Sequence, residues 1–307
     1  MRKICRVLLS GLSILCLAAC SYPSQPIQGV IITGQNNHNW PVSSEAIRLT
    51  LEQSGLFAMD VAVSPAAGED MAGFQVDFSR YELVVLDYNG DPWPEPMQRA
   101  FEEYVNGGGG LIIYHAADNA FPEWKFYNQV IALGGWGGRN ETAGPYRYWQ
   151  DGALVRDTTA GPGGSHGKRS PYLLNLRRGK EHPIMQGLPE RWMHAKDELY
   201  DRMRGPGEIG DLLLTGYADP DRGGSGREEP LVFTVQYGSA RIFHTMLGHA
   251  GTSLEDNPAM QCAGFQTLLL RAGEWCARGC VTQDVPADFP DAEAVSLRPA
   301  YREPEQQ

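Results

Sequence analysis

Three of the seven histidines follow segments that have the composition of strands. His38 follows the apolar run 29–33, His115 follows the run 111–114, and His249 follows a hairpin expected over 231–246. A lone histidine is usually a structural group, but imidazoles that meet at one edge of a sheet can act as general bases near neutral pH or bind a metal ion. We therefore expect these three side chains to converge.

A second group of reactive side chains lies within seven residues. The segment 194–200 (HAKDELY) holds a histidine, two acids and a phenol. Adjacent acids usually mark a solvated face, but Trp192 and Leu199 flank these two, which favours partial burial. One of the acids could then bind a metal ion or transfer protons.

The elements that must position these residues alternate between strands and helices. Each expected strand is short and rich in apolar residues, and amphipathic segments separate the strands. Strands are expected at 29–33, 57–63, 81–87, 111–114, 212–217 and in the hairpin 231–246, and helices at 43–53, from Pro94 to about Gly107, and at 258–276. This order predicts parallel β-α-β units in one domain. In such sheets ligands bind beyond the carboxyl ends of the strands, where His38 and His115 lie.

One long stretch breaks this pattern. Ten of the 34 residues from 134 to 167 are glycine, and four aromatic residues are interleaved with them. A loop of this length inside a compact domain is usually functional or disordered, and the aromatic residues count against disorder.

Two glycine-containing motifs lack the context that their usual functions need. Residues 163–167 match G-x-S-x-G, but a hydrolase elbow needs a strand before the serine and a helix after it, and prolines flank this one. The glycines near Gly134 follow a helix instead of a strand, which argues against a dinucleotide loop. We expect neither a serine hydrolase nor a nucleotide cofactor.

The N-terminus is typical of a secreted bacterial lipoprotein. Three basic residues precede an uncharged, mostly apolar run, 7–19, which is too short to span a bilayer. The sequence LAAC at 17–20 resembles a lipobox, so we expect a signal peptide at 1–19, lipidation of Cys20 and a tether at 20–27. A buried helix with a chance cysteine is the alternative. Ser21 favours the outer membrane, with the protein facing the periplasm.

Charge and cysteine content fit this interpretation. The whole chain has a net charge of −11, and removal of residues 1–19 leaves 23 basic and 37 acidic residues, a net charge of −14. This excess of acid argues against nucleic acid as a partner and leaves the lipid anchor as the only membrane attachment. Cys262, Cys276 and Cys280 would remain as structural residues, and the last two could pair if the helix unwinds near Gly279.

Six segments together resemble the ThuA-like (trehalose utilisation) family. They occur in the family's order between about residues 28 and 290, followed by a tail at 291–307. They are TGQNNHNW, GGGLIIYHAADNAFPEW, GGWGGRN, EHPIMQGLP, HAKDELYD and YGSARIFHTMLGH. The resemblance implies a class I glutamine amidotransferase-like, flavodoxin-type α/β fold. This is a doubly wound, mostly parallel sheet in a single domain, here with a long Gly/aromatic-rich insertion. It also implies a role in sugar metabolism, often beside oxidoreductases that make 3-keto-sugars.

One departure from the wider superfamily bears on the chemistry. Amidotransferases carry a nucleophilic cysteine in the turn after the glycine-rich strand, and here His115 occupies that place. Glutamine hydrolysis through a thioester is therefore not expected, because no thiolate is positioned to attack.

These observations lead to a preferred hypothesis and an alternative. The preferred one is an enzyme acting on 3-keto-glycosides by elimination, hydration or hydrolysis, with His38, His115, Glu198 and His249 as catalytic residues. A divalent metal ion held by the three histidines could assist. The expected substrate-binding residues are Asn89, Asn119, Trp136, Tyr146, Trp149, His166, His194, Asp197 and Tyr200. For each aromatic residue, core packing is an equally good explanation. The alternative is a non-catalytic carbohydrate-binding lipoprotein.

Overall fold

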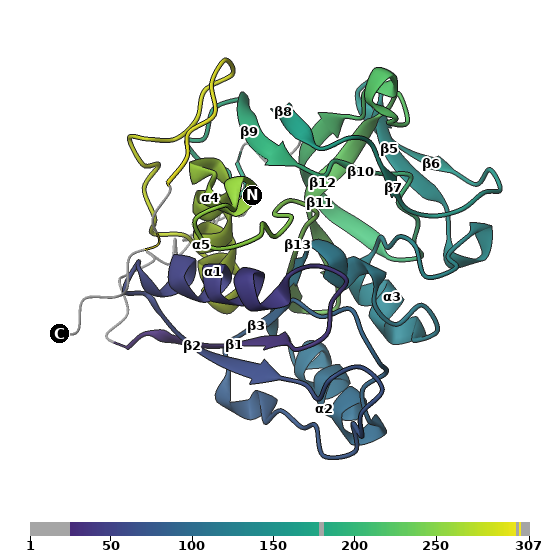
Figure 1. The fold of residues 1–307 in the computed structure, drawn as a ribbon, viewed down its shortest axis with the longest axis vertical. Coiled ribbons are helices and arrows are strands. Elements are labelled where there is room, and N and C mark those ends of the chain that lie inside the picture. The colour runs from purple at the N-terminus through teal and green to yellow at the C-terminus, as the bar shows by residue number, and fades with distance from the viewer. Residues whose placement is uncertain (1–24, 178–180, 299–300, 302–307) are drawn as a thin grey trace, which may run out of the picture.

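The computed structural model describes residues 25–177, 181–298 and 301 (Figure 1). The expected signal peptide, Cys20 and most of the tether lie outside these residues. No helix among the described residues is long and apolar enough to cross a membrane.

Five parallel strands form one half of the central sheet, in the order β2-β1-β3-β4-β13. They are β1 (Ile27–Thr33), β2 (Phe57–Val63), β3 (Leu83–Leu86), β4 (Gly110–Tyr114) and β13 (Ala240–Thr245). The apolar, often β-branched residues of β1, β3 and β4 are buried because helices cover both faces of the sheet, whereas Val61 and Val63 of the edge strand β2 are exposed. The order is that of a flavodoxin-type fold, so the expected doubly wound α/β class is confirmed.

Helices lie on both faces of the parallel half (Figure 1). Helices α1 (Trp40–Glu52) and α5 (Ala263–Arg278) pack on one face, and α2 (Glu95–Asn106) lies across the sheet from α1. The short α3 (Lys125–Ile131) packs on β12, described below. The single helix expected at 258–276 is instead α4 (Pro258–Gln261) followed by α5. Cys262 breaks it, because its extended backbone pairs with Leu297.

The other half of the sheet is antiparallel. The expected hairpin is confirmed as β12 (Glu228–Tyr237) and β13, and β11 (Glu208–Tyr217) extends it. Two further strands, β8 (Ser170–Leu176) and β9 (Arg191–Asp197), complete the order and were not expected from the sequence. Their register shifts between Ser170 and Tyr172, so the strand period is interrupted.

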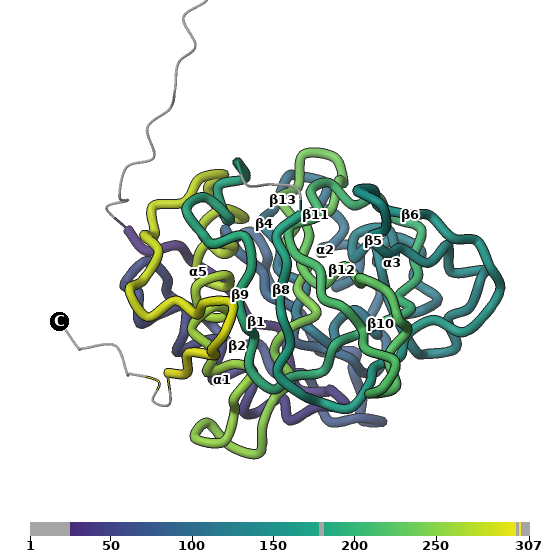
Figure 2. Tube along the Cα trace, turned by 90° about the horizontal axis from the view of Figure 1, so that it is seen from above, coloured from purple at the N-terminus to yellow at the C-terminus, as the bar shows by residue number. Residues whose placement is uncertain are grey.

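The glycine-rich stretch 134–167 contains strands, where the sequence suggested a loop. Strands β5 (Tyr146–Gln150) and β6 (Ala153–Asp157) form an antiparallel hairpin at the end of the molecule away from α5 (Figures 1 and 2). Its turn is Asp151-Gly152, both with positive φ, as two-residue hairpin turns require. Farther along, β7 (Ser165–His166) pairs with β10 (Tyr200–Asp201) in a separate small sheet.

The turn after β1 predicts a stability effect. Gly34 has φ of +114°, and a Cβ there would lie 2.4 Å from the Ser64 backbone nitrogen. We expect Gly34→Ala to lower the free energy of unfolding by at least ~2 kcal/mol through strain and this clash. Gly68→Ala is the control, because Gly68 also has positive φ but nothing lies within 4 Å. Urea denaturation measures both, and equal losses would contradict the assigned clash.

Candidate active site

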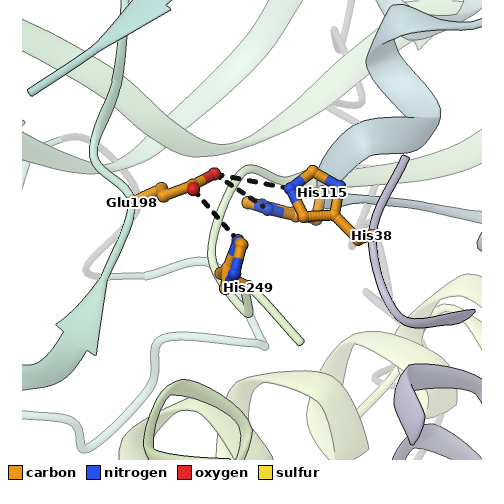
Figure 3. Close-up of side chains that lie close together, drawn as sticks. All are labelled: His38, His115, Glu198 and His249. Carbon is orange, nitrogen blue, oxygen red and sulfur yellow. Dashed lines mark ion pairs between the residues drawn. The ribbon is translucent and has the colours of Figure 1, made fainter. Parts of the chain in front are cut away.

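Four side chains converge at the carboxyl edge of the parallel strands (Figure 3). His38 follows β1, His115 follows β4, Glu198 follows β9, and His249 follows β13. One ligand atom from each of the four lies within 4.8 Å of the others. The convergence anticipated for the three histidines is therefore present in the structure, and Glu198 joins them.

The Glu198 carboxylate lies at the centre of this cluster, which we call the His₃Glu centre. Its Oε1 is 3.1 Å from His249 Nδ1, and its Oε2 is 3.5 Å from His38 Nε2 and 3.7 Å from His115 Nε2 (Figure 3). Burial alone would raise the pKa of the Glu198 carboxyl, but the three imidazoles that face it, His115 foremost, lower that pKa well below its usual range. The group is therefore an anion at neutral pH.

His115 is held in an uncommon backbone conformation. It has φ of +45° at the start of the short 3₁₀ helix His115–Asn119, so the chain turns sharply out of β4 and the ring points to the cluster. Its Nδ1 lies 2.7 Å from the Met246 carbonyl oxygen and must donate to it. Nε2 therefore faces Glu198 and the Tyr200 hydroxyl, which is 3.1 Å away. Although burial opposes charge on this ring, Glu198 and Asp197 raise the pKa of His115.

His38 is oriented by a chain of polar groups that the sequence did not single out as site residues. Asn36 Oδ1 accepts from the His38 backbone N–H and lies 3.3 Å from its Nδ1, while the Asn36 amide donates to Asp87. The fully buried Asp87 also accepts from Ser43 and Thr33. Burial lowers the pKa of His38 to about 4, so its Nε2 keeps a lone pair directed at the cluster.

Asp197 fixes the relative positions of Glu198 and His249. Its two buried oxygens accept the backbone N–H groups of Glu198, Gly248 and His249 at 2.7–2.9 Å. They also accept His194 Nε2 at 2.7 Å. Although burial alone would lower it, the hydrogen bond to Asp197 raises the pKa of His194 to about 10, so the two form a buried ion pair.

The His₃Glu centre fits a divalent metal ion. Three imidazole nitrogens and one carboxylate form a donor set that zinc and similar cations accept. His249 Nδ1 is buried and makes no well-aligned hydrogen bond, despite lying close to Glu198. His115 and His38 each have Nδ1 at a carbonyl or amide oxygen, as metal-binding histidines usually do. These four residues could hold the ion.

A cleft of about 460 Å³ opens onto this centre. His166, on β7, stands beside Glu198 with its Nε2 3.9 Å from Oε1. The Trp136 ring packs edge-on against Tyr200 at 4.7 Å and borders the same space. The lining residues are Asn37, His38, Asn89, Asn119, Trp136, Gly137, His166, Glu198, Tyr200 and His249. Asn37 lies in the segment TGQNNHNW but was not among the expected site residues.

Four of the expected substrate-binding residues do not line this cleft. Tyr146 lies under the Arg204 guanidinium at 3.8 Å and donates to the Pro162 carbonyl oxygen. Trp149 lies on the β5–β6 hairpin near Arg177. His194 and Asp197 are buried behind the centre. These four therefore have packing or positioning roles in place of the ligand contacts expected from the sequence.

The three cysteines among the described residues, Cys262, Cys276 and Cys280, do not contribute to this centre. Cys262 and Cys276 are buried free thiols, and the Cys276 thiol donates to the Leu111 carbonyl oxygen. The Cys276–Cys280 pairing that the spacing allowed does not form.

Comparisons with known proteins agree on one family. The ThuA family, described as trehalose utilisation, matches residues 30–276. A ThuA-like protein from Parabacteroides merdae is 63% identical, with a TM-score of 0.90 over 91% of this chain and 100% of its own. A ThuA-like protein from Bacteroides uniformis is 16% identical, with a TM-score of 0.51 over 85% of this chain and 97% of its own, and shares the fold. No curated protein matches this sequence.

The role of Asp197 predicts a large loss of stability in Asp197→Asn. An amide in place of the carboxylate removes the partner of His194 and turns a donor towards backbone N–H groups, at a cost of about 3–5 kcal/mol. Chemical denaturation with chelator present measures this without any contribution from a metal ion. Asp151→Asn, on the exposed turn of the β5–β6 hairpin, is the matched control. A difference below about 1 kcal/mol between the two variants would refute this role.

Proposed function

This chain belongs to the ThuA (trehalose utilisation) family, and from that membership and the site geometry we propose that it is an enzyme that acts on a 3-keto-glycoside with one divalent metal ion. The ion would be held by His38, His115, Glu198 and His249. The observation that carries the proposal is the convergence of these four side chains beside a ligand-sized cleft.

The lining of the cleft supports a carbohydrate ligand. The amides of Asn37, Asn89 and Asn119 border it, and such groups both donate to and accept from hydroxyl groups. The Asn89 amide already donates to Asn37 at 2.7 Å, which holds both side chains at the cleft wall. Trp136 adds an aromatic surface of the kind that packs against the apolar face of a sugar ring.

The reaction would begin with loss of the proton at carbon 2 of the sugar. A ketone at carbon 3 acidifies that proton, because the electron pair left by the C–H bond moves into an enolate. His166 is suited to accept the proton, since it lines the cleft and is the one histidine there outside the proposed ligand set. A bound divalent cation would supply positive charge for the enolate oxygen.

The second step would break the glycosidic bond. The enolate electron pair returns to form the C1=C2 double bond, and the bond from carbon 1 to the glycosidic oxygen cleaves. The leaving oxygen takes a proton, and an enone and an alcohol result. Water can then add to the enone. Tyr200, hydrogen-bonded to His115 and lining the cleft, would help to orient the ketone end of the sugar.

Glutamine hydrolysis is not supported by this site. His115 occupies the turn after β4, and the free thiols among the described residues, Cys262 and Cys276, are fully buried. A buried thiol cannot reach a substrate in the cleft.

The metal proposal predicts about one divalent ion per chain after reconstitution, measured by elemental analysis. Glu198→Ala and His115→Ala should each lose the ion, because each removes one of four ligands. His182→Ala is the control, since His182 lies in a turn outside the centre and should retain the ion. Wild-type protein that takes up no ion would refute the metal site.

The reaction predicts that a 3-keto-glucoside is turned over and that the matching glucoside is not. His166→Ala should lower kcat by about 10²–10⁴-fold while metal content stays unchanged, because a general base is lost. Chelator should abolish turnover. Product formation is followed through the ultraviolet absorbance of the enone and release of the alcohol. Tight sugar binding with no turnover of any keto-sugar would instead favour a non-catalytic carbohydrate-binding protein.

A further inference from the structure

A second cavity borders the His₃Glu centre and has a different character from the main cleft. It has a volume of about 390 Å³ and shares Asn37, His38 and His249 with the cleft. The cleft contributes amides and Trp136, whereas this second cavity is bordered by two cations, Arg169 and Lys196. The proposed reactive centre thus lies between a neutral space and a basic one.

The two cations lie together because of strand pairing. Ser170 on β8 pairs with Asp197 on β9. Arg169 immediately precedes β8 and Lys196 lies on β9, so each cation is one residue from that pair. Both are exposed, and Lys196 lies two residues before the ligand candidate Glu198. Their charges therefore lie close to the centre without being part of it.

These cations differ from most of the exposed arginines. The exposed Arg80, Arg156 and Arg222 are each paired with an acid at 3.3–3.9 Å. Neither Arg169 nor Lys196 has an acidic partner within 4.0 Å among the residues that the structure describes. In a chain with 37 acidic and 26 basic residues, two unpaired cations at one cavity leave charge available for a ligand.

One acid also borders the second cavity. Asp256 is exposed, but its Oδ2 accepts the Thr252 hydroxyl at 2.8 Å within the same loop. It makes no ion pair with either cation. The charges of Arg169 and Lys196 exceed that of Asp256. Apart from the His₃Glu centre, the side chains that border the second cavity therefore carry a net positive charge.

We propose that the sugar taken by this site carries an anionic group, a carboxylate or a phosphate, which lies in the second cavity against Arg169 and Lys196. The guanidinium fork suits both groups, and the lysine adds a point charge. The sugar ring would lie in the main cleft. The identity of the reaction rests on the proposed function, whereas the anion preference rests on the cations of the second cavity.

The test compares the binding of glucose, glucuronate and glucose 6-phosphate to the purified full chain by calorimetry at low and high salt. We expect tighter binding of at least one anionic sugar than of glucose, and a loss of that preference at high salt. The glucuronate and phosphate arms show which anion is preferred. Arg169→Gln and Lys196→Gln should each weaken anionic-sugar binding about five-fold, and together about twenty-fold.

Lys168→Gln is the matched control, because Lys168 adjoins Arg169 in sequence but lines a different cavity. It should leave the preference unchanged. Equal affinity for all three sugars, a preference that survives the double substitution, or an equal loss in Lys168→Gln would each overturn the inference. If the double variant loses the preference, the anion inference is supported even if no keto-sugar is turned over. If neutral keto-sugars are turned over and no anionic sugar is preferred, the anion inference is overturned and the proposed function is not.

Discussion

The buried carboxylate of Asp197 is the interaction on which the geometry of the site depends. Burying an anion is costly, and here the cost is offset by four donors and by the positive charge of His194. Two of those donors belong to Glu198 and His249, which come from segments 51 residues apart in the chain. One side chain therefore sets the spacing between an acid at the end of β9 and a histidine after β13.

The sheet brings the other two histidines to the same place. Strands β1, β4 and β13 are all in the parallel half of the sheet, so the chain leaves each of them at one edge. β13 is antiparallel to its hairpin partner β12 but parallel to β4, and this pairing directs His249 to the edge where His115 lies. Because His115 has positive φ, the chain turns directly after β4 and the His115 ring points towards the centre. With an extended backbone at this position, the chain would continue in the direction of β4.

The parallel strands and the position of the histidines could largely be predicted from the sequence, for a physical reason. Strands β1 and β4 are apolar on both faces, so 29–33 and 111–114 stand out, whereas 57–63 stands out by its alternation. A histidine after an apolar run of this kind must lie near the ligand-binding edge. Strands β8 and β9 were not predicted from the sequence because they mix polar and aromatic residues and their register is irregular. The β5–β6 hairpin did have a usable signal, the Asp-Gly turn. For Tyr146 the sequence left substrate binding and core packing equally open, because composition cannot show that an arginine, Arg204, covers its ring.

The residues that orient the centre, Asn36 and Asp87, were not predicted as site residues for a different reason. Asn36 and Asp87 act through other side chains, and nothing in their spacing marks a contact between β1 and β3 segments 51 residues apart. Their position becomes meaningful only when the strands are paired side by side. Residues that orient a reactive group are in general harder to find in a sequence than the group itself, since their identity depends on tertiary contacts.

The charges at the centre explain why a cation and a proton would compete there. Asp197 is balanced by His194, whereas Glu198 has three imidazoles around it, of which His38 is neutral because burial lowers its pKa to about 4. The positive charge that balances Glu198 must then come from a group other than His38. A proton on His115, whose pKa is raised by Glu198 and Asp197, meets that need, and a divalent cation bound by the four ligand atoms would meet it as well. Cation binding would displace the proton, so the affinity that we propose for a metal ion would depend on pH through Glu198, the carboxylate that the three histidines surround.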